Sequence, residues 1–134
     1  IAISFAYSSE PTDVPSPTDR IRENQIGVYE DKVIIDVKGA SLSRYANTDS
    51  MDPVIDAGAN GLEIMPTNED ELHVGDIVAY ESKYASELVV HRVVGIKSDA
   101  EGKYFVLRGD NSTEEDPEKV RLSQIKYILI GVLY

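Results

Sequence analysis

The chain has 134 residues, enough for one domain that buries its own hydrophobic core. Its 13 Lys and Arg against 24 Asp and Glu give a net charge of −11, which disfavours a surface that binds the phosphates of nucleic acid. The absence of cysteine excludes disulfides, thiolate zinc sites and cysteine nucleophiles.

The N-terminal part of the chain differs in composition from the rest. Residues 1–7 are apolar but too short to cross a bilayer, which takes about 20 residues. They are either a first strand or the end of a membrane anchor. The three prolines in 8–19 predict an extended linker. We therefore expect a stub and linker over 1–19 and one domain over 20–134.

Strand signals dominate this domain. The one helix that the pattern suggests is short and lies at 16–24, after a Ser-Pro-Thr-Asp start. The expected strands are β-branched or alternating runs at 25–29, 32–37, 62–65, 76–81, 87–96, 103–108 and 125–134. Several short strands separated by turn clusters predict a mainly β, barrel-like domain or folded sheet.

Three features of the domain could carry chemistry. His91 lies inside the strand run 87–96, where an imidazole is either a general base on a rigid strand or a residue on the solvent-exposed face of the strand. Ser50 precedes Met51-Asp52-Pro53, so it is either a nucleophile presented at a bend or part of a simple turn. The acidic segment 109–117 is a solvated loop, a calcium site lacking EF-hand spacing, or the source of an aspartate that orients a histidine.

Together these segments resemble the boxes of type I signal peptidases. Residues 50–53 resemble the Ser-Met-x-Pro box, 90–95 the box of the general base, and 109–111 the Gly-Asp-Asn box, with Asp116 at the place of a further aspartate. Bacterial enzymes carry lysine as the base, whereas His91 matches the archaeal and endoplasmic-reticulum type. If Gly58 is the family's glycine, residues 66–75 are an insertion, which leaves the register of the cleft open.

The resemblance implies a role for each matching residue. Ser50 would be the nucleophile and His91 the general base, and Asp116 would orient the imidazole, with Asp110 as its rival. Thr48 and the Ser50 backbone N–H would bind the oxyanion.

The resemblance also implies a substrate and a setting. An extended peptide would lie beside a strand, with Met51 and Pro53 in contact with it. The fold would be β-rich, as in the related LexA-like proteases. The expected function is a membrane-associated serine endopeptidase that cleaves signal peptides or similar N-terminal segments. Its domain would lie outside the cytoplasm on an N-terminal anchor, and it would need no cofactor, metal or nucleic acid.

Two alternatives remain open at this point. One is a protease of the same fold but another specificity, including a self-cleaving regulator. The other is a non-catalytic β-domain that binds a peptide or partner at a sheet edge.

Overall fold

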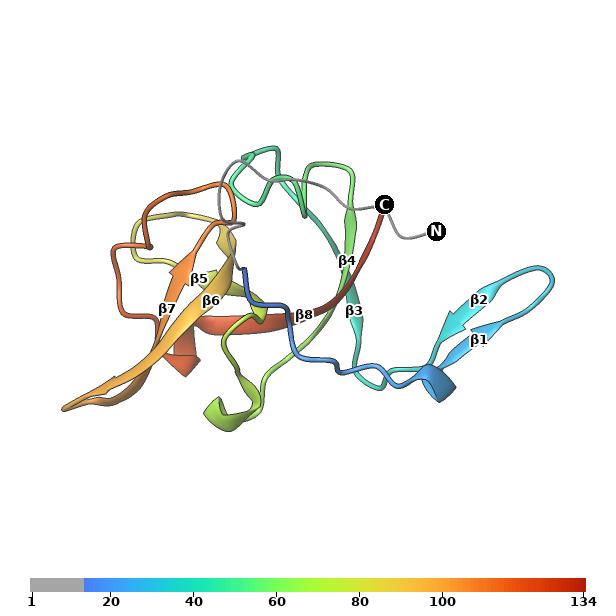
Figure 1. Ribbon diagram of the computed structural model, residues 1–134, viewed down its shortest axis with the longest axis horizontal. Helices are drawn as coiled ribbons and strands as arrows, with labels where there is room; N and C mark the ends of the chain where they lie inside the picture. The colour runs from blue at the N-terminus through green and yellow to red at the C-terminus, as the bar shows by residue number, and fades with distance from the viewer. Residues whose placement is uncertain (1–13) are drawn as a thin grey trace, which may run out of the picture.

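Two antiparallel sheets make up the fold, and the larger has the strand order β3-β4-β8-β5-β6-β7 (Figure 1). The computed structural model describes residues 14–134. The strands are β1 (Ile26–Val28), β2 (Val33–Ile35), β3 (Ser41–Arg44), β4 (Asn60–Ile64), β5 (Ile77–Glu81), β6 (Leu88–Asp99), β7 (Gly102–Arg108) and β8 (Ile125–Leu133). The prediction of a mainly β domain is confirmed, although the larger sheet is not closed into a barrel. The strand or anchor expected at 1–7 lies outside the described residues.

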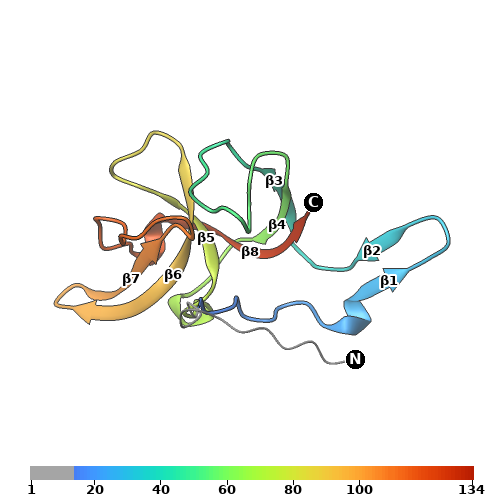
Figure 2. The same ribbon diagram turned by 45° about the horizontal axis from the view of Figure 1, so that its top comes forward.

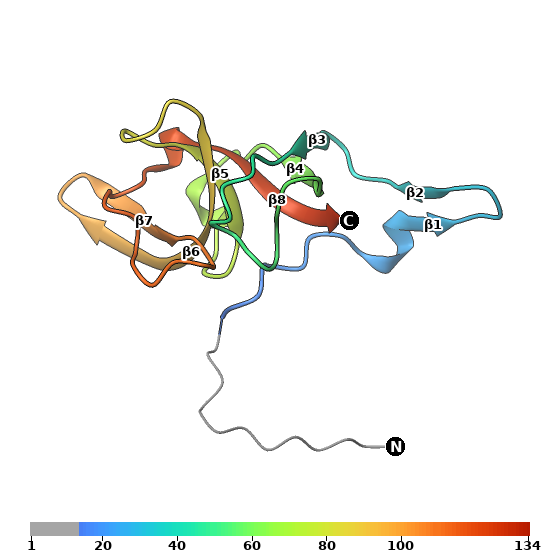
Figure 3. The same cartoon turned by 90° about the horizontal axis from the view of Figure 1, so that it is seen from above.

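The smaller sheet is the hairpin β1–β2, which projects from one end of the molecule (Figure 3). Its strands pair through Ile26 with Ile35 and Val28 with Val33, as the two predicted runs around a short turn suggested. Val28 is 77% exposed and Val33 60% exposed. The hairpin therefore carries apolar side chains in water and packs little against the larger sheet.

The helix expected at 16–24 is wrong. Residues 14–20 have no regular secondary structure, and the helical turn nearby is a 3-10 helix over Glu23–Gln25. The cause is Asp76, which is fully buried and accepts hydrogen bonds from the Thr18 N–H at 2.9 Å and from Arg20 Nη2 at 2.7 Å. Because a tertiary carboxylate accepts the Thr18 N–H, this N–H does not join a helix and the segment is held against the domain.

The C-terminal strand β8 lies in the middle of the sheet and joins its two halves. It pairs with β4 on one side and with β5 on the other. The main core cluster lies over β5–β8 and includes Tyr80, Phe105 and Leu107, each at most 2% exposed. A second cluster, which includes Met51, Ile55 and Leu129, packs the loop between β3 and β4 onto the sheet.

One difference from the predicted strands concerns the half that contains β3 and β4. Strand β3 was not predicted, because its apolar residue Leu42 is 61% exposed and gives no alternating pattern. The segment 65–76 between β4 and β5 is irregular apart from a 3-10 helix over Glu69–Glu71.

The loops β3–β4 and β5–β6 rise on the same side of the sheet (Figure 2). This arrangement brings segments far apart in the sequence to one edge of the domain. No helix within residues 14–134 has the length and apolar character needed to cross a bilayer.

Candidate active site

Ser50 lies in the loop between β3 and β4, at the start of a tight turn over 51–54. The loop is held by Met51 and Ile55, which are 4% and 3% exposed in the second core cluster. Burial of these side chains anchors the turn, and Ser50 itself is partly exposed to solvent. Its Oγ lies 3.1 Å from Thr48 Oγ1, so the two hydroxyls share a hydrogen bond.

His91 lies on β6, opposite Val78 of β5. Its Nδ1 is 2.7 Å from Asp116 Oδ2 and 2.9 Å from Oδ1, and the two side chains are 14% and 11% exposed. An ionised carboxylate only accepts hydrogen bonds, so Nδ1 carries the hydrogen and Nε2 of a neutral ring has a free lone pair. The imidazole is therefore arranged as a base whose basic atom is Nε2.

Tyr80 is a third member of this group that the sequence did not reveal. Its hydroxyl donates to Asp116 Oδ2 at 2.6 Å. Burial, and next the hydrogen bond to Asp116, raise the pKa of Tyr80 well above its usual range, so the phenol stays a donor. Nothing in the strand run 76–81 distinguished Tyr80 from a packing tyrosine, because its partner comes from a different loop.

Gly109 brings the Ser50 loop and His91 together. A Cβ on this residue would lie 2.6 Å from the Ser50 carbonyl oxygen and 3.0 Å from His91 Nε2, so no other residue fits without movement. Asn111 completes the contact by donating its N–H to the Ser50 carbonyl oxygen at 3.0 Å. The Ser50 carbonyl oxygen and His91 Nε2 therefore both lie directly beside Gly109.

Asp110 points to a different partner. It forms two parallel hydrogen bonds with Arg92, from Nε at 2.8 Å and from Nη2 at 2.7 Å. Arg92 is 4% exposed and also donates to the carbonyl oxygens of Gly75 and Pro15, each at 3.0 Å. The carboxylate beside the imidazole is that of Asp116, while Asp110 ties the loop to the N-terminal segment.

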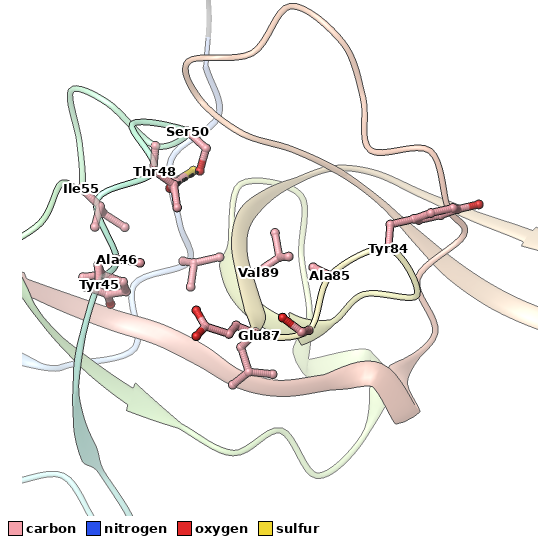
Figure 4. A pocket seen from close by; sticks show the side chains of 13 residues that line it. Tyr45, Ala46, Thr48, Ser50, Ile55, Tyr84, Ala85, Glu87 and Val89 are labelled. Atoms are coloured by element: carbon pink, nitrogen blue, oxygen red, sulfur yellow. Dashed lines mark hydrogen bonds between the residues drawn. The ribbon is translucent and has the colours of Figure 1, made fainter.

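A cleft of about 460 Å³ opens beside Ser50 (Figure 4). Thr48, Ser50 and Met51 line one wall, and the opposite wall comes from the β5–β6 loop and the start of β6. Pro53 is exposed and is not among the lining residues. Residues 84–90 line that opposite wall, so the cleft runs beside the start of β6, where an extended peptide could lie.

A group of three carboxylates lies next to Ser50. Asp49, Asp52 and Asp56 place oxygens within 4.8 Å of one another, and Asp49 and Asp56 are exposed. Partial burial, and next the charges of Asp56 and Asp49, raise the pKa of Asp52. Carboxylate oxygens suit a hard cation such as Ca²⁺, but the positions of these side chains in an exposed turn do not by themselves make a site.

The arrangement has the parts of a serine hydrolase: a surface serine, a histidine whose second nitrogen is free, and a carboxylate on the first nitrogen. Ser50 and His91, both within the described part of the chain, share no hydrogen bond; the hydroxyl of Ser50 pairs with that of Thr48 and could still donate to an imidazole if it accepts from Thr48. Catalytic hydrogen bonds are often longer without substrate and tighten when it binds.

Comparison with known proteins gives one partial relationship. The chain is 37% identical over 68 residues to the "Signal peptidase complex catalytic subunit SEC11" of Debaryomyces hansenii. The match covers 50% of this chain and 40% of that protein, so well under two thirds of the relative is spanned. No family model matches the chain, and no solved structure matches it. This distant, partial homology supports a relationship to the signal peptidase I-like family.

Proposed function

We propose that this chain is a serine endopeptidase that removes signal peptides or similar N-terminal segments, with Ser50 as nucleophile and His91 as general base. The observation that carries the proposal is the His91–Asp116 pair, whose free Nε2 faces the loop that holds Ser50. The partial homology to a signal peptidase subunit supports the same reaction class.

The proposed reaction follows from the positions of these groups. Ser50 Oγ attacks the scissile carbonyl carbon while His91 Nε2 takes its proton, and Asp116 stabilises the resulting imidazolium. The tetrahedral oxyanion accepts hydrogen bonds from the Ser50 N–H and from Thr48 Oγ1, which already lies 3.1 Å from Ser50 Oγ. His91 then returns the proton to the leaving amine, and water releases the acyl group from Ser50 by the reverse steps.

The proposed setting is a membrane, with the domain on its extracytoplasmic side and the substrate an exported polypeptide. The relative is named as the catalytic subunit of a signal peptidase complex, and signal peptides are apolar segments that reside in membranes. As the end of a membrane anchor, the apolar residues 1–7 would place the domain beside such a substrate.

The test is cleavage of a polypeptide bearing a signal peptide, with the full chain in detergent or lipid and the products read by mass spectrometry. We expect a single cut that Ser50→Ala and His91→Ala each abolish. Ser98→Ala is the matched control, because Ser98 is an exposed serine at the far end of β6. Cleavage that persists in Ser50→Ala would refute the proposal. Binding of the substrate without a cut would favour a non-catalytic peptide-binding domain.

A further inference from the structure

The cleft beside Ser50 carries a single charge. Among the thirteen described residues that line it, Glu87 alone is ionisable near neutral pH, and the rest are apolar, hydroxyl-bearing or tyrosine side chains. Figure 4 shows the Glu87 carboxylate reaching from the β5–β6 loop into the space before Tyr45 and Ala46. A substrate in the cleft would therefore meet one negative charge.

Glu87 has no neutralising partner within residues 14–134. None of the ion pairs and side-chain hydrogen bonds there involves Glu87, whereas the nearby Glu81 lies 3.7 Å from Lys126 Nζ. The small side chains of Ala85 and Ser86 precede Glu87 and leave room around its carboxylate. An unpaired carboxylate in a groove can form an ion pair with a cationic side chain of the substrate.

We infer that Glu87 is a specificity-determining residue that favours substrates with a lysine or arginine at the subsite it faces. This inference rests on the proposed peptidase function, since it assigns a preference to the same cleft. The net charge of −11 acts in the same direction, because an acidic domain attracts cationic peptides at long range. The long aliphatic part of lysine or arginine would pack along the apolar wall while its charged end reaches the carboxylate.

Glu87 is exposed, so the effect has the size of an exposed ion pair. Such a pair is expected to change kcat/KM by about two- to fivefold, because solvent and salt screen it. The preference should therefore shrink as ionic strength rises.

The experiment scans one cleavable signal-peptide substrate with Lys, Met or Glu at each of the positions flanking the cut. The wild-type chain is compared with Glu87→Gln and Glu87→Lys. Glu30→Gln is the matched control, because Glu30 is an exposed carboxylate at the tip of the β1–β2 hairpin and its loss changes the net charge equally.

We expect Lys to be preferred over Glu at one position in the wild type, with the preference lost in Glu87→Gln, reversed in Glu87→Lys and kept in Glu30→Gln. An unchanged Lys-to-Glu ratio in Glu87→Gln would overturn the inference while cleavage itself upheld the proposed function. Affinities of the same peptides for Ser50→Ala, measured by fluorescence anisotropy, provide a readout independent of turnover. Equal affinities of Lys and Glu peptides there would also overturn it.

Discussion

Asp110 and Asp116 both follow β7, yet replacing each of them with asparagine should impair the protein in a different way. Asp116 lies against His91 and Tyr80, and Asp110 lies against Arg92. We predict that Asp116→Asn loses catalysis and keeps most of its stability, whereas Asp110→Asn loses stability. Asparagine has nearly the shape of aspartate, so the comparison isolates charge and hydrogen-bond direction.

The expected size of the Asp116→Asn effect comes from its hydrogen bonds. Oδ2 of Asp116 accepts from Tyr80 at 2.6 Å and lies 2.7 Å from His91 Nδ1. An amide NH₂ turned toward Nδ1 would force the hydrogen onto Nε2, which could then no longer take the serine proton. The same change of tautomer in a serine protease lowers kcat by about 10⁴-fold.

The Asp110→Asn effect comes from a buried ion pair. The Arg92 and Asp110 side chains are 5% and 8% exposed, so the guanidinium left behind has little access to water. Removing one member of a buried pair costs about 3–5 kcal/mol. For a domain of this size, that loss lowers Tm by about 10 °C or more.

The assay is kcat on the signal-peptide substrate together with thermal unfolding by circular dichroism, for both variants under the same conditions. The reasoning is refuted if Asp116→Asn retains near-wild-type kcat. It is equally refuted if Asp110→Asn unfolds at the wild-type temperature.

Three further predictions concern single residues. Tyr80→Phe should lower the free energy of unfolding by about 1.5–3 kcal/mol in urea titrations, because a hydrogen bond to a carboxylate is lost; an unchanged midpoint would contradict this. Gly109→Ala should reduce kcat at least about 100-fold by forcing the Ser50 loop from His91, whereas the control Gly131→Ala, whose Cβ would meet Leu62 at 3.7 Å, should be tolerated. Burial raises the pKa of Glu63 above its unfolded value, so the stability it contributes is complete at acid pH and is lost as pH rises through the folded pKa. Glu63→Gln should therefore raise Tm at pH 7 and leave it nearly unchanged at pH 4, and equal Tm values at pH 7 would refute the assignment.

The strands that the sequence predicted well include interior strands of the larger sheet, which have a neighbour on each side. Runs such as 87–96 and 125–134 are rich in β-branched residues because β6 and β8 pack on both neighbours. The edge strand β3 has no such pattern, and its pairing with β4 rests on backbone hydrogen bonds. The prediction of a short helix failed for a different reason: the carboxylate that accepts the Thr18 N–H is that of Asp76, 58 residues away.

In the candidate site too, the sequence revealed some residues, whereas their contacts depend on the tertiary fold. Ser50, His91 and the Gly-Asp-Asn segment were visible in the sequence because each lies in a short motif. Which aspartate lies beside His91 depends on how the loop after β7 turns back across the sheet, with the Asp116 N–H bonded to the Leu107 carbonyl oxygen at 2.7 Å. That path is a tertiary property, as is the contact between Tyr80 and Asp116.

The central position of β8 has a consequence for how the chain matures. The half of the sheet with β3 and β4 holds Ser50, and the half with β5, β6 and β7 holds His91, yet the pairing that unites them is made by the last strand. During synthesis from the N-terminus, the two halves wait for residues 125–133 to leave the ribosome before they can close together. A chain that ends before residue 125 would lack this pairing, so the proposed site would not assemble from its two halves.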